Sequence, residues 1–287
     1  MFSERIEFVQ RKFGPVFSQD NETIFFNPET PSHCLSLSLD KLVAYQTLFP
    51  VVDQLETAGI KCVQSISQRK FNLAIISIPK SKKLARHLIY LATKAVPEGL
   101  IIVDGNKSNG IESIIRDLEK KIKITNFISK AHGKTAWFET PADLEMYKDT
   151  PLKVEDGFET QAGVFSSDGV DPASKLLIQL LPKDLMGVGA DLGGGWGYLS
   201  AKVLETNSIR ELHFIEADLN AINLAKNNLN DKRVKFYWCD ALKWKAPKLL
   251  DFIIMNPPFH HLGRAIPTLG IDFIKAASRN LKKSGTL

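Results

Sequence analysis

A glycine-rich turn constrains the fold of this chain more than any other feature of its sequence. Residues 191–197 read Asp-Leu-Gly-Gly-Gly-Trp-Gly and overlap the end of a short apolar run, 189–192. Glycine permits a tight turn and a close approach of the backbone to a ligand, and a helix after the turn points its amino terminus at that ligand. The segment therefore predicts a strand, a turn and a helix of a nucleotide-binding α/β fold, with a purely structural turn as the alternative.

Alternating apolar patterns on both sides of the turn extend this unit into a sheet. They predict helices over 173–181, 198–204 and 220–229, and strands over 211–215, 234–238 and 251–255. Pro182 would end the first of these helices. Strands that alternate with helices indicate a doubly wound α/β domain, which we place at residues 150–287.

The first half of the chain, residues 1–145, also alternates. Its pattern predicts a helix over 42–58 that ends at Gly59, a strand over 73–77, a helix over 84–95 and a strand over 99–103. Residues 72–80 align without a gap with residues 251–259. We therefore predict two Rossmann-like copies of one domain, with a chance match of two buried strands that end in proline as the alternative.

The first copy has lost chemically important residue types of the second. Ser77 replaces Asn256, Ile78 replaces Pro257, Lys80 replaces Phe259, and no glycine-rich turn precedes them at a suitable distance. The first copy is therefore predicted to be degenerate and inactive.

The alignment also bears on the end of the chain. The first copy enters a strand after Gly99, whereas the second reaches Gly285 and stops two residues later at Leu287. We expect the second domain to lack its C-terminal end, which puts its activity in question.

The predicted strand over 251–255 is followed by Asn256, Pro257, Pro258 and Phe259, which together can hold a planar base. The amide oxygen and a prolyl carbonyl accept hydrogen bonds from an exocyclic amine, and phenylalanine offers a stacking face. Such an amine is a weak nucleophile because its lone pair is delocalised, and hydrogen bonds to Asn256 and Pro257 favour the pyramidal form that can accept a methyl group. A strand that is merely stopped by proline is the alternative.

The two motifs support each other through their spacing. They lie about 60 residues apart, as expected if both occupy the carboxyl ends of parallel strands in one sheet and lie side by side there. Hydride transfer from a dinucleotide has no need for Asn-Pro-Pro-Phe. The pair therefore predicts a methyltransferase that uses S-adenosyl-L-methionine, with direct in-line transfer and neither a metal nor a covalent intermediate.

Acidic residues at two strand ends are candidates for cofactor contacts. Glu216 lies 25 residues after Asp191, where a carboxylate can accept both ribose hydroxyls. Asp240 follows the strand over 234–238 and is placed to meet the adenine amino group. The alternatives are a solvent-facing carboxylate for Glu216 and an ordinary loop aspartate for Asp240.

Charge and cysteine content narrow the class of protein. The net charge is +5, and its excess lies in residues 1–141, which hold 19 Lys and Arg against 14 Asp and Glu. This asymmetry is compatible with a polyanionic partner such as RNA, or with an ordinary solvated surface. Three scattered cysteines support neither a disulfide framework nor a zinc site, and no apolar run is long enough to span a bilayer. We expect a soluble protein of the reducing cytoplasm.

A basic cluster lies where the first copy has lost its pocket. Lys80, Lys82, Lys83 and Arg86 could meet RNA phosphates if this domain serves for docking. An exposed basic helix start is the alternative.

Taken together, these segments resemble the bacterial ribosomal RNA guanine-N2 methyltransferases of the RsmC type. The resemblance rests on Gly-Val-Phe-Ser at 163–166, Asp-Gly-Val-Asp at 168–171, the glycine turn and Asn-Pro-Pro-Phe-His at 256–260, and covers nearly the whole chain. It implies a degenerate N-terminal methyltransferase-like domain and Phe165 at the border of the pocket. It also implies that Asn256 orients guanine N2 of small-subunit ribosomal RNA, and that the cofactor is bound by Gly193, Gly195, Glu216 and Asp240. We add Phe165 and, from the glycine turn, Asp191 and Gly197 as candidate cofactor-binding residues.

Other functions remain open from the sequence. Asn-Pro-Pro-aromatic also suits methylation of adenine N6 or of a protein glutamine amide, because both present a conjugated NH2 group. A non-catalytic RNA-binding or assembly protein is a different class of alternative. We expect a monomer that acts on ribosomal RNA or the 30S subunit, with the modified nucleotide left open.

Overall fold

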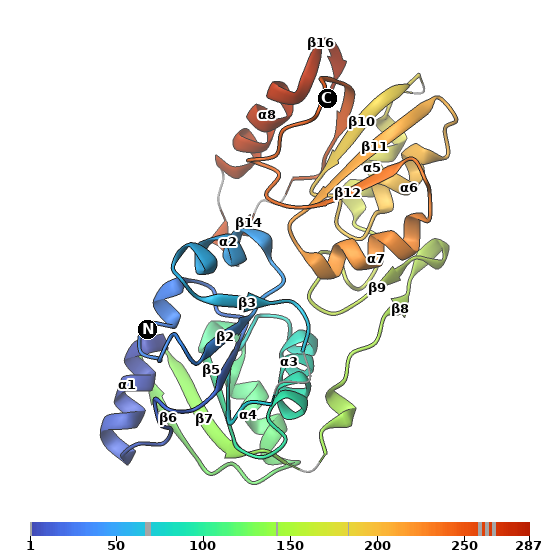
Figure 1. Cartoon of the computed structure of the whole chain (residues 1–287). Helices are drawn as coiled ribbons and strands as arrows, with labels where there is room; N and C mark the ends of the chain where they lie inside the picture. The colour runs from blue at the N-terminus through green and yellow to red at the C-terminus, as the bar shows by residue number, and fades with distance from the viewer. Residues whose placement is uncertain are drawn as a thin grey trace. The chain divides into compact units, whose positions relative to one another are not determined.

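The computed structural model describes residues 2–66, 70–141, 143–182, 184–257, 260–261, 264–265 and 268–287. The chain divides into two compact units (Figure 1). The first comprises Met1–Thr47 and Val51–Thr150, and the second comprises Leu48–Pro50 and Pro151–Leu287.

A seven-stranded sheet organises the first unit. Its strands are β1 (Thr23–Phe26), β2 (Leu42–Tyr45), β3 (Lys61–Val63), β4 (Leu73–Ser77), β5 (Leu100–Asn106), β6 (Asn126–Lys130) and β7 (Gly133–Glu139). They lie in the order β3-β2-β1-β4-β5-β7-β6, with the first five parallel and β7 antiparallel to both of its neighbours. The helices of this half are α1 (Phe2–Phe13), α2 (Phe49–Thr57), α3 (Lys82–Ala95) and α4 (Ile111–Glu119).

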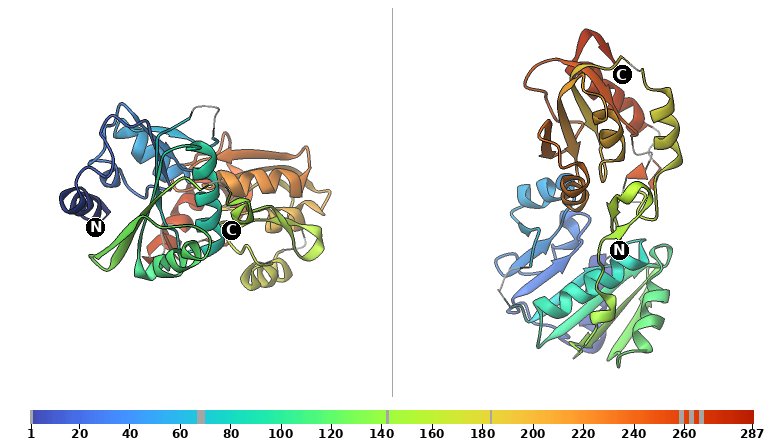
Figure 2. Two further views of the ribbon diagram at one scale, coloured as in Figure 1. Left: turned by 90° about the horizontal axis from the view of Figure 1, so that it is seen from below. Right: turned by 90° about the vertical axis from the view of Figure 1, so that its right-hand side faces the viewer.

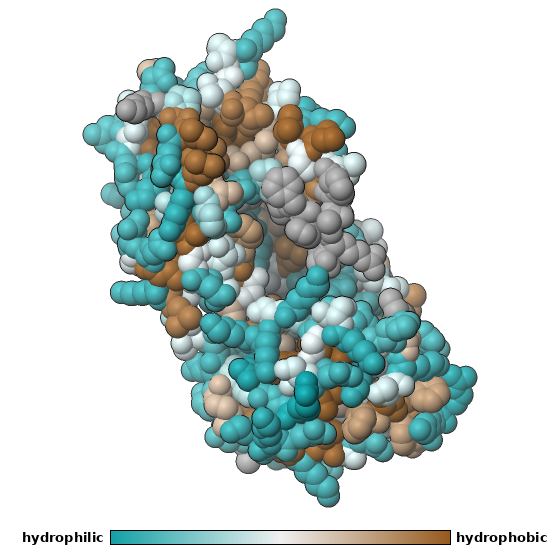
Figure 3. Space-filling view, turned by 180° about the vertical axis from the view of Figure 1, so that it is seen from behind, coloured by the Kyte–Doolittle hydropathy of each residue, from teal (hydrophilic) through white to brown (hydrophobic). Residues whose placement is uncertain are grey.

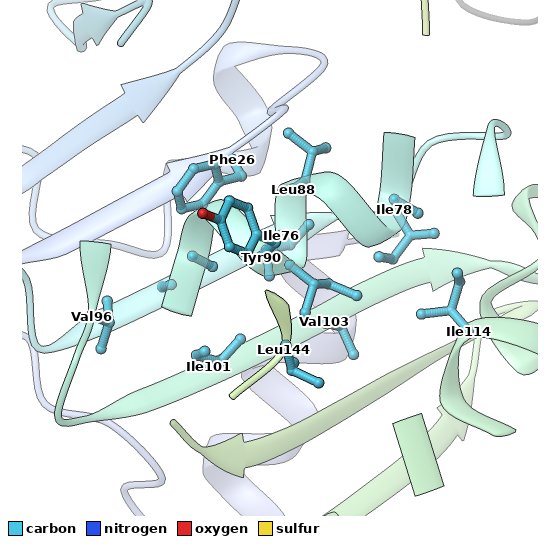
Figure 4. Close-up of a cluster of buried hydrophobic side chains, with 14 of the residues drawn as sticks. Phe26, Ile76, Ile78, Leu88, Tyr90, Val96, Ile101, Val103, Ile114 and Leu144 are labelled. Atoms are coloured by element: carbon cyan, nitrogen blue, oxygen red, sulfur yellow. The ribbon is translucent and has the colours of Figure 1, made fainter. Parts of the chain in front are cut away.

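The core of the first unit lies between the sheet and helices α3 and α4. Figure 4 shows Phe26, Ile76 and Val103 of the strands packed with Leu88 of α3 and Ile114 of α4. The alternate residues of the parallel strands are also buried, which explains why these strands read as continuous apolar runs.

The second unit contains a five-stranded parallel sheet. Its strands are β10 (Gly187–Leu192), β11 (Ile209–Glu216), β12 (Val234–Trp238), β13 (Leu250–Ile254) and β16 (Leu281–Thr286), in the order β12-β11-β10-β13-β16. Two short antiparallel pairs join β8 (Leu152–Lys153) to β9 (Glu159–Thr160) and β14 (His260–His261) to β15 (Arg264–Ala265). The helices are α5 (Pro172–Leu180), α6 (Tyr198–Leu204), α7 (Leu219–Leu229) and α8 (Thr268–Asn280).

Helices cover both faces of this second sheet, as a doubly wound fold requires (Figure 2). Phe214 and Phe252 point to the face packed by α6 and α7, whereas Ile215 and Ile253 point to the face packed by α8. The predicted helices and strands of this domain are confirmed, with bounds that shift by at most two residues.

The two sheets share one strand order, which confirms the predicted alignment of residues 72–80 with 251–259. The order β3-β2-β1-β4-β5 of the first unit corresponds to β12-β11-β10-β13-β16 of the second. The register agrees at one pair, because Leu73 pairs with Leu100 and the aligned Phe252 pairs with Thr286, whereas the pairing of β13 with β16 shifts register between Leu250 and Phe252.

The predicted helix over 42–58 is wrong in its first part. Residues Leu42–Tyr45 form β2, pair with β1 and β3 inside the sheet, and only then does the chain turn into α2. A buried apolar run of four residues fits a strand and a helix equally well by periodicity. Pairing with strands that are distant in sequence decided between them.

Candidate active site

Four segments that are separated in sequence line one pocket in the second unit. They are the glycine turn at residues 193–196, Phe165 with Ser166, Asp171 with Ser174, and Asn256. Strands β10 and β13 are parallel neighbours, and Asp191 pairs with Ile254. The segments that follow these strands therefore emerge at the same edge of the sheet, as the spacing of the two motifs predicted.

The glycine turn has a backbone that other residues adopt only with strain. Gly193, Gly195 and Gly197 have φ values of +78°, +58° and +100°, in the left-handed region. A Cβ atom at Gly194 would lie 2.3 Å from the ring of Phe214, whereas a Cβ atom at Gly195 would meet nothing within 4 Å. Gly195 therefore borders open space that a ligand can approach closely.

Glu216 is tied to the glycine turn by its carboxylate. One oxygen accepts a hydrogen bond from the backbone N–H of Gly195 and the other from that of Asp218, each at 2.8 Å. Burial raises the pKa of Glu216, although these backbone hydrogen bonds lower it. Each carboxylate oxygen has a further lone pair and can accept a second hydrogen bond, for example from a ribose hydroxyl.

Asp191 carries a buried carboxylate oxygen that lacks a protein partner. Its Oδ2 accepts a hydrogen bond from Ser200 Oγ at 2.7 Å, whereas Oδ1 has no partner among the described residues. Burial raises the pKa of Asp191 to about 7, and the nearby charge of Glu216 also raises it. An unpaired buried acceptor is costly, and a bound cationic ligand would offset that cost.

We expect Asp191 to make the second unit less stable as pH rises from about 4 to about 7, the window between its unfolded and folded pKa values. The folded protein holds this proton more tightly than the unfolded chain, so each pH unit removes up to about 1.4 kcal/mol of unfolding free energy. Asp191→Asn keeps an acceptor for Ser200 and should abolish this contribution. Urea unfolding measured between about pH 4 and pH 7 should show the unfolding free energy of the variant rising relative to that of the parent protein as pH rises. A constant difference between the two free energies across this range would contradict the assignment.

Asp240 lies at the end of β12, beside the end of β11. Its Oδ1 accepts a hydrogen bond from the backbone N–H of Leu242 at 2.9 Å, and the N–H of Cys239 donates to the carbonyl of Glu216. Burial raises the pKa of the Cys239 thiol to about 11, so this side chain stays neutral. The position leaves Asp240 available at the edge where the adenine amine was predicted.

Phe165 is held by its backbone and leaves its ring exposed. Its carbonyl accepts a hydrogen bond from Trp196 Nε1 at 3.0 Å, and the residue is 58% exposed. Trp196 itself is 4% exposed and packs against Phe158 and Tyr198. Trp196 therefore anchors the Phe165 segment to the glycine turn, a role that the sequence did not reveal.

Asn256 presents a fixed amide to the pocket. Its Nδ2 donates to Asp171 Oδ2 and to Ser174 Oγ, each at 2.9 Å. Both amide hydrogens are thus used, and the amide oxygen is left to accept hydrogen bonds. Pro257 follows directly and is partly buried, whereas Pro258 and Phe259 lie outside the described residues.

The equivalent edge of the first sheet is closed by its own side chains. By register, Asn27 takes the place of Gly193 and shares its left-handed backbone, with φ of +58°. Asn27 Nδ2 donates to the carbonyl of Ser77 at 3.0 Å, and Gln46, which takes the place of Glu216, donates to the carbonyl of Pro28 at 2.9 Å. These contacts give a physical reason for the predicted degeneracy of the first copy.

The four cations predicted to bind RNA lie at the start of α3 and within its first turns. Lys80, Lys82 and Lys83 are exposed, and Lys82 Nζ lies 2.9 Å from Ser113 Oγ. Arg86 is only partly exposed; its Nε donates to Asp117 at 2.8 Å and its guanidinium lies over the ring of Tyr147. The hydrogen bond from Arg86 lowers the pKa of Asp117.

Neither a membrane-spanning helix nor a metal-binding cluster occurs in the described part of the chain. No helix there is both long and apolar enough to cross a bilayer, and no three His, Cys, Asp or Glu side chains gather as a metal site.

The face drawn in Figure 3 is largely hydrophilic, with smaller hydrophobic patches.

Comparisons with known proteins match both halves of the chain. The family model named methyltransferase small domain matches residues 155–287, and the model named methyltransferase small domain N-terminal matches residues 26–139. Two curated relatives are named ribosomal RNA small subunit methyltransferase C. The one from Shewanella loihica is 30% identical over 80% of this chain and 71% of its own length, and the one from Acinetobacter baylyi is 28% identical over 74% and 67%. The chain spans between 66% and 71% of the first such relatives.

A solved structure has the same fold over almost the entire chain. It is the T. thermophilus 16S rRNA N2 G1207 methyltransferase (RsmC) in complex with AdoMet and guanosine, with a TM-score of 0.76 and 19% identity. The match covers 98% of this chain and 81% of that one.

Proposed function

Because the chain belongs to the ribosomal RNA small subunit methyltransferase C family, we propose that it methylates the exocyclic N2 of a guanosine in small-subunit ribosomal RNA. The methyl donor is S-adenosyl-L-methionine. The observation that carries the proposal is the pocket that joins the glycine turn to the amide of Asn256.

Residues that line the pocket or lie beside the glycine turn suit this donor. S-adenosyl-L-methionine is cationic and supplies an electrophilic methyl group on its sulfonium. Gly195 borders open space, Asp191 Oδ1 lacks a partner among the described residues, and Glu216 can accept further hydrogen bonds. We assign cofactor contacts to these three residues together with Phe165, Gly193, Gly197 and Asp240.

Asn256 and Pro257 act on the acceptor amine. The amide oxygen of Asn256 and the carbonyl of Pro257 each accept one of its N–H groups. These hydrogen bonds reduce delocalisation of the nitrogen lone pair into the ring and direct it at the methyl group. Stacking of the base on Phe259 stays a prediction from the sequence.

A base within folded RNA reaches such a pocket only when it is unpaired or turned out of its stack. We propose that the degenerate domain, residues 1–145, docks the RNA, and that residues 150–287 carry the chemistry. Lys80, Lys82 and Lys83 are the cations that we assign to phosphate contacts. Arg86, which was predicted with them, is less exposed than the three lysines and pairs with Asp117.

Replacing Lys80, Lys82 and Lys83 together with alanine should weaken RNA binding and lower the slope of log K against log salt by about 2 to 3, because each lost phosphate contact removes about 0.7 to 0.9. Affinity for S-adenosyl-L-methionine should not change. Filter binding at several salt concentrations measures this slope for the parent protein and for the variant. Lys120, Lys121 and Lys123 form a second group of exposed lysines at the end of α4, close to Asp117 and Glu119 in sequence. Their triple replacement should have a smaller effect, and an equal loss in both triple variants would contradict a specific docking site.

Methyl transfer to a panel of acceptors tests the proposed function. Isolated 30S subunits, naked small-subunit RNA, adenine-containing DNA and a release factor are each incubated with the protein and methyl-labelled cofactor. Labelling of ribosomal RNA or its subunit supports the proposal. Labelling of DNA adenine or of the release factor supports the two alternative acceptors, and RNA binding without labelling supports a non-catalytic protein.

We further propose that the protein acts as a monomer in the cytoplasm, where its ribosomal substrate occurs. Light scattering with and without cofactor tests the oligomeric state, and a stable dimer would overturn this part.

A further inference from the structure

We propose that Asp171 is a positioning residue that, together with Ser174, fixes which end of the Asn256 amide faces the acceptor. The inference rests on the proposed function for its catalytic consequence. Its hydrogen-bonding basis can be tested without any activity.

The contacts of Asp171 join two elements at the pocket. Asp171 is the N-cap of α5, and its Oδ2 accepts hydrogen bonds both from the backbone N–H of Ser174 and from Asn256 Nδ2, each at 2.9 Å. Ser174 is buried, and its hydroxyl accepts the second hydrogen bond from Nδ2. Asp171, Ser174 and Asn256 all line the pocket.

An asparagine amide needs such a restraint because its terminal torsion has two nearly equivalent orientations. Rotation by half a turn exchanges the oxygen for the NH2 group, and the NH2 group would then face the donors of the acceptor amine. An ionised aspartate can only accept hydrogen bonds. Asp171 therefore selects the orientation in which the oxygen of Asn256 faces the pocket.

An exchange of the two side chains separates this role from capping of α5. Asn256→Asp alone brings two carboxylates together in place of a hydrogen bond, and we expect kcat to fall by about 100-fold. Adding Asp171→Asn restores the hydrogen bond with the roles exchanged, so that residue 171 donates and residue 256 accepts. The double variant also keeps an N-cap on α5, because asparagine caps helices as well as aspartate does. The double variant should then be at least about tenfold faster than Asn256→Asp.

The control is Asp168→Asn, which removes a negative charge from an exposed position in the same segment. It should neither lower the kcat of the parent protein nor rescue Asn256→Asp. The KM for RNA and the affinity for S-adenosyl-L-methionine should be the same for the parent protein and the double variant, because the exchange leaves the total charge of the pair unchanged. A double variant no faster than Asn256→Asp, or rescue by Asp168→Asn, would overturn the inference.

Thermal unfolding of the same variants gives a second readout. Asn256→Asp should lower the melting temperature and Asp171→Asn should restore most of the loss, whether or not ribosomal RNA is the substrate. If the parent protein methylates nothing while this coupling is present, the proposed function fails and the pairing stands. If the parent is active and the two substitutions are additive in both kcat and melting temperature, the pairing fails and the function stands.

Discussion

Asn256→Ala should lower kcat by about 100- to 1,000-fold while affinity for S-adenosyl-L-methionine changes little. The substitution removes the oxygen that accepts a hydrogen bond from the acceptor amine, and the loss of one directed polar contact to a reacting group costs about this much. The glycine turn does not depend on the amide, because Gly193 and Gly194 donate to the carbonyl of Ile215. Single-turnover methyl transfer and calorimetric titration of the cofactor measure the two quantities separately.

The control for this variant is Asn223→Ala, an asparagine exposed on α7. It should retain the parent rate. Equal activity of Asn256→Ala and the parent would mean that the amide does not contact the reacting group, and a matching loss of cofactor affinity would mean that Asn256 acts mainly through the fold of the pocket.

Gly195→Ala should lower affinity for S-adenosyl-L-methionine by at least about tenfold, because the new methyl group occupies space that the bound cofactor needs. A Cβ atom at this position meets no protein atom within 4 Å, so the added group projects into the pocket. The residue keeps its left-handed backbone at a cost of roughly 1–2 kcal/mol in stability. Titration calorimetry should give one cofactor per parent chain, since the equivalent edge of the first sheet is closed by Asn27 and Gln46.

Gly59→Ala is the matched control for backbone strain. Gly59 has φ of +80°, and its added Cβ atom also meets nothing within 4 Å, but it lies in the first unit. It should lose comparable stability and keep the parent affinity. If both variants lose affinity equally, strain rather than occupied space explains the effect.

Local patterns were sufficient to predict the second domain from β10 to β13, but not α8. The glycine turn marks the end of β10 and the start of α6, and the intervening apolar runs are long enough to define β11, α7 and β12. These patterns depend only on residues that are close in sequence, so they can be recognised without knowledge of the tertiary fold. The alignment of the two copies placed the last strand of the second domain after Gly285, which is wrong, because β16 covers Leu281–Thr286 and pairs with β13.

The first domain was harder because its strands are short and its apolar runs ambiguous. The run over Leu42–Tyr45 merged with α2 into one predicted helix, and the four-residue strand β1 and the hairpin of β6 and β7 were not predicted. Pairing across the sheet fixed these elements, and such pairing leaves little trace in a single sequence.

The same limit applies to the site. Asn256 and Glu216 carry recognisable chemistry at strand ends, so the sequence could nominate them. Asp171 and Ser174 lie 85 and 82 residues from Asn256 and meet it only in the fold. A helix over 173–181 was predicted, but nothing in the sequence indicated that the residue that caps it would also hold the amide.

Analysis of the modified nucleoside tests the central claim most directly. Small-subunit ribosomal RNA is incubated with the protein and methyl-labelled S-adenosyl-L-methionine, digested to nucleosides and examined by chromatography and mass spectrometry. The account predicts label in N2-methylguanosine with the parent protein and almost none with Asn256→Ala. Label in a different nucleoside, or equal N2-methylguanosine from both proteins, would contradict it.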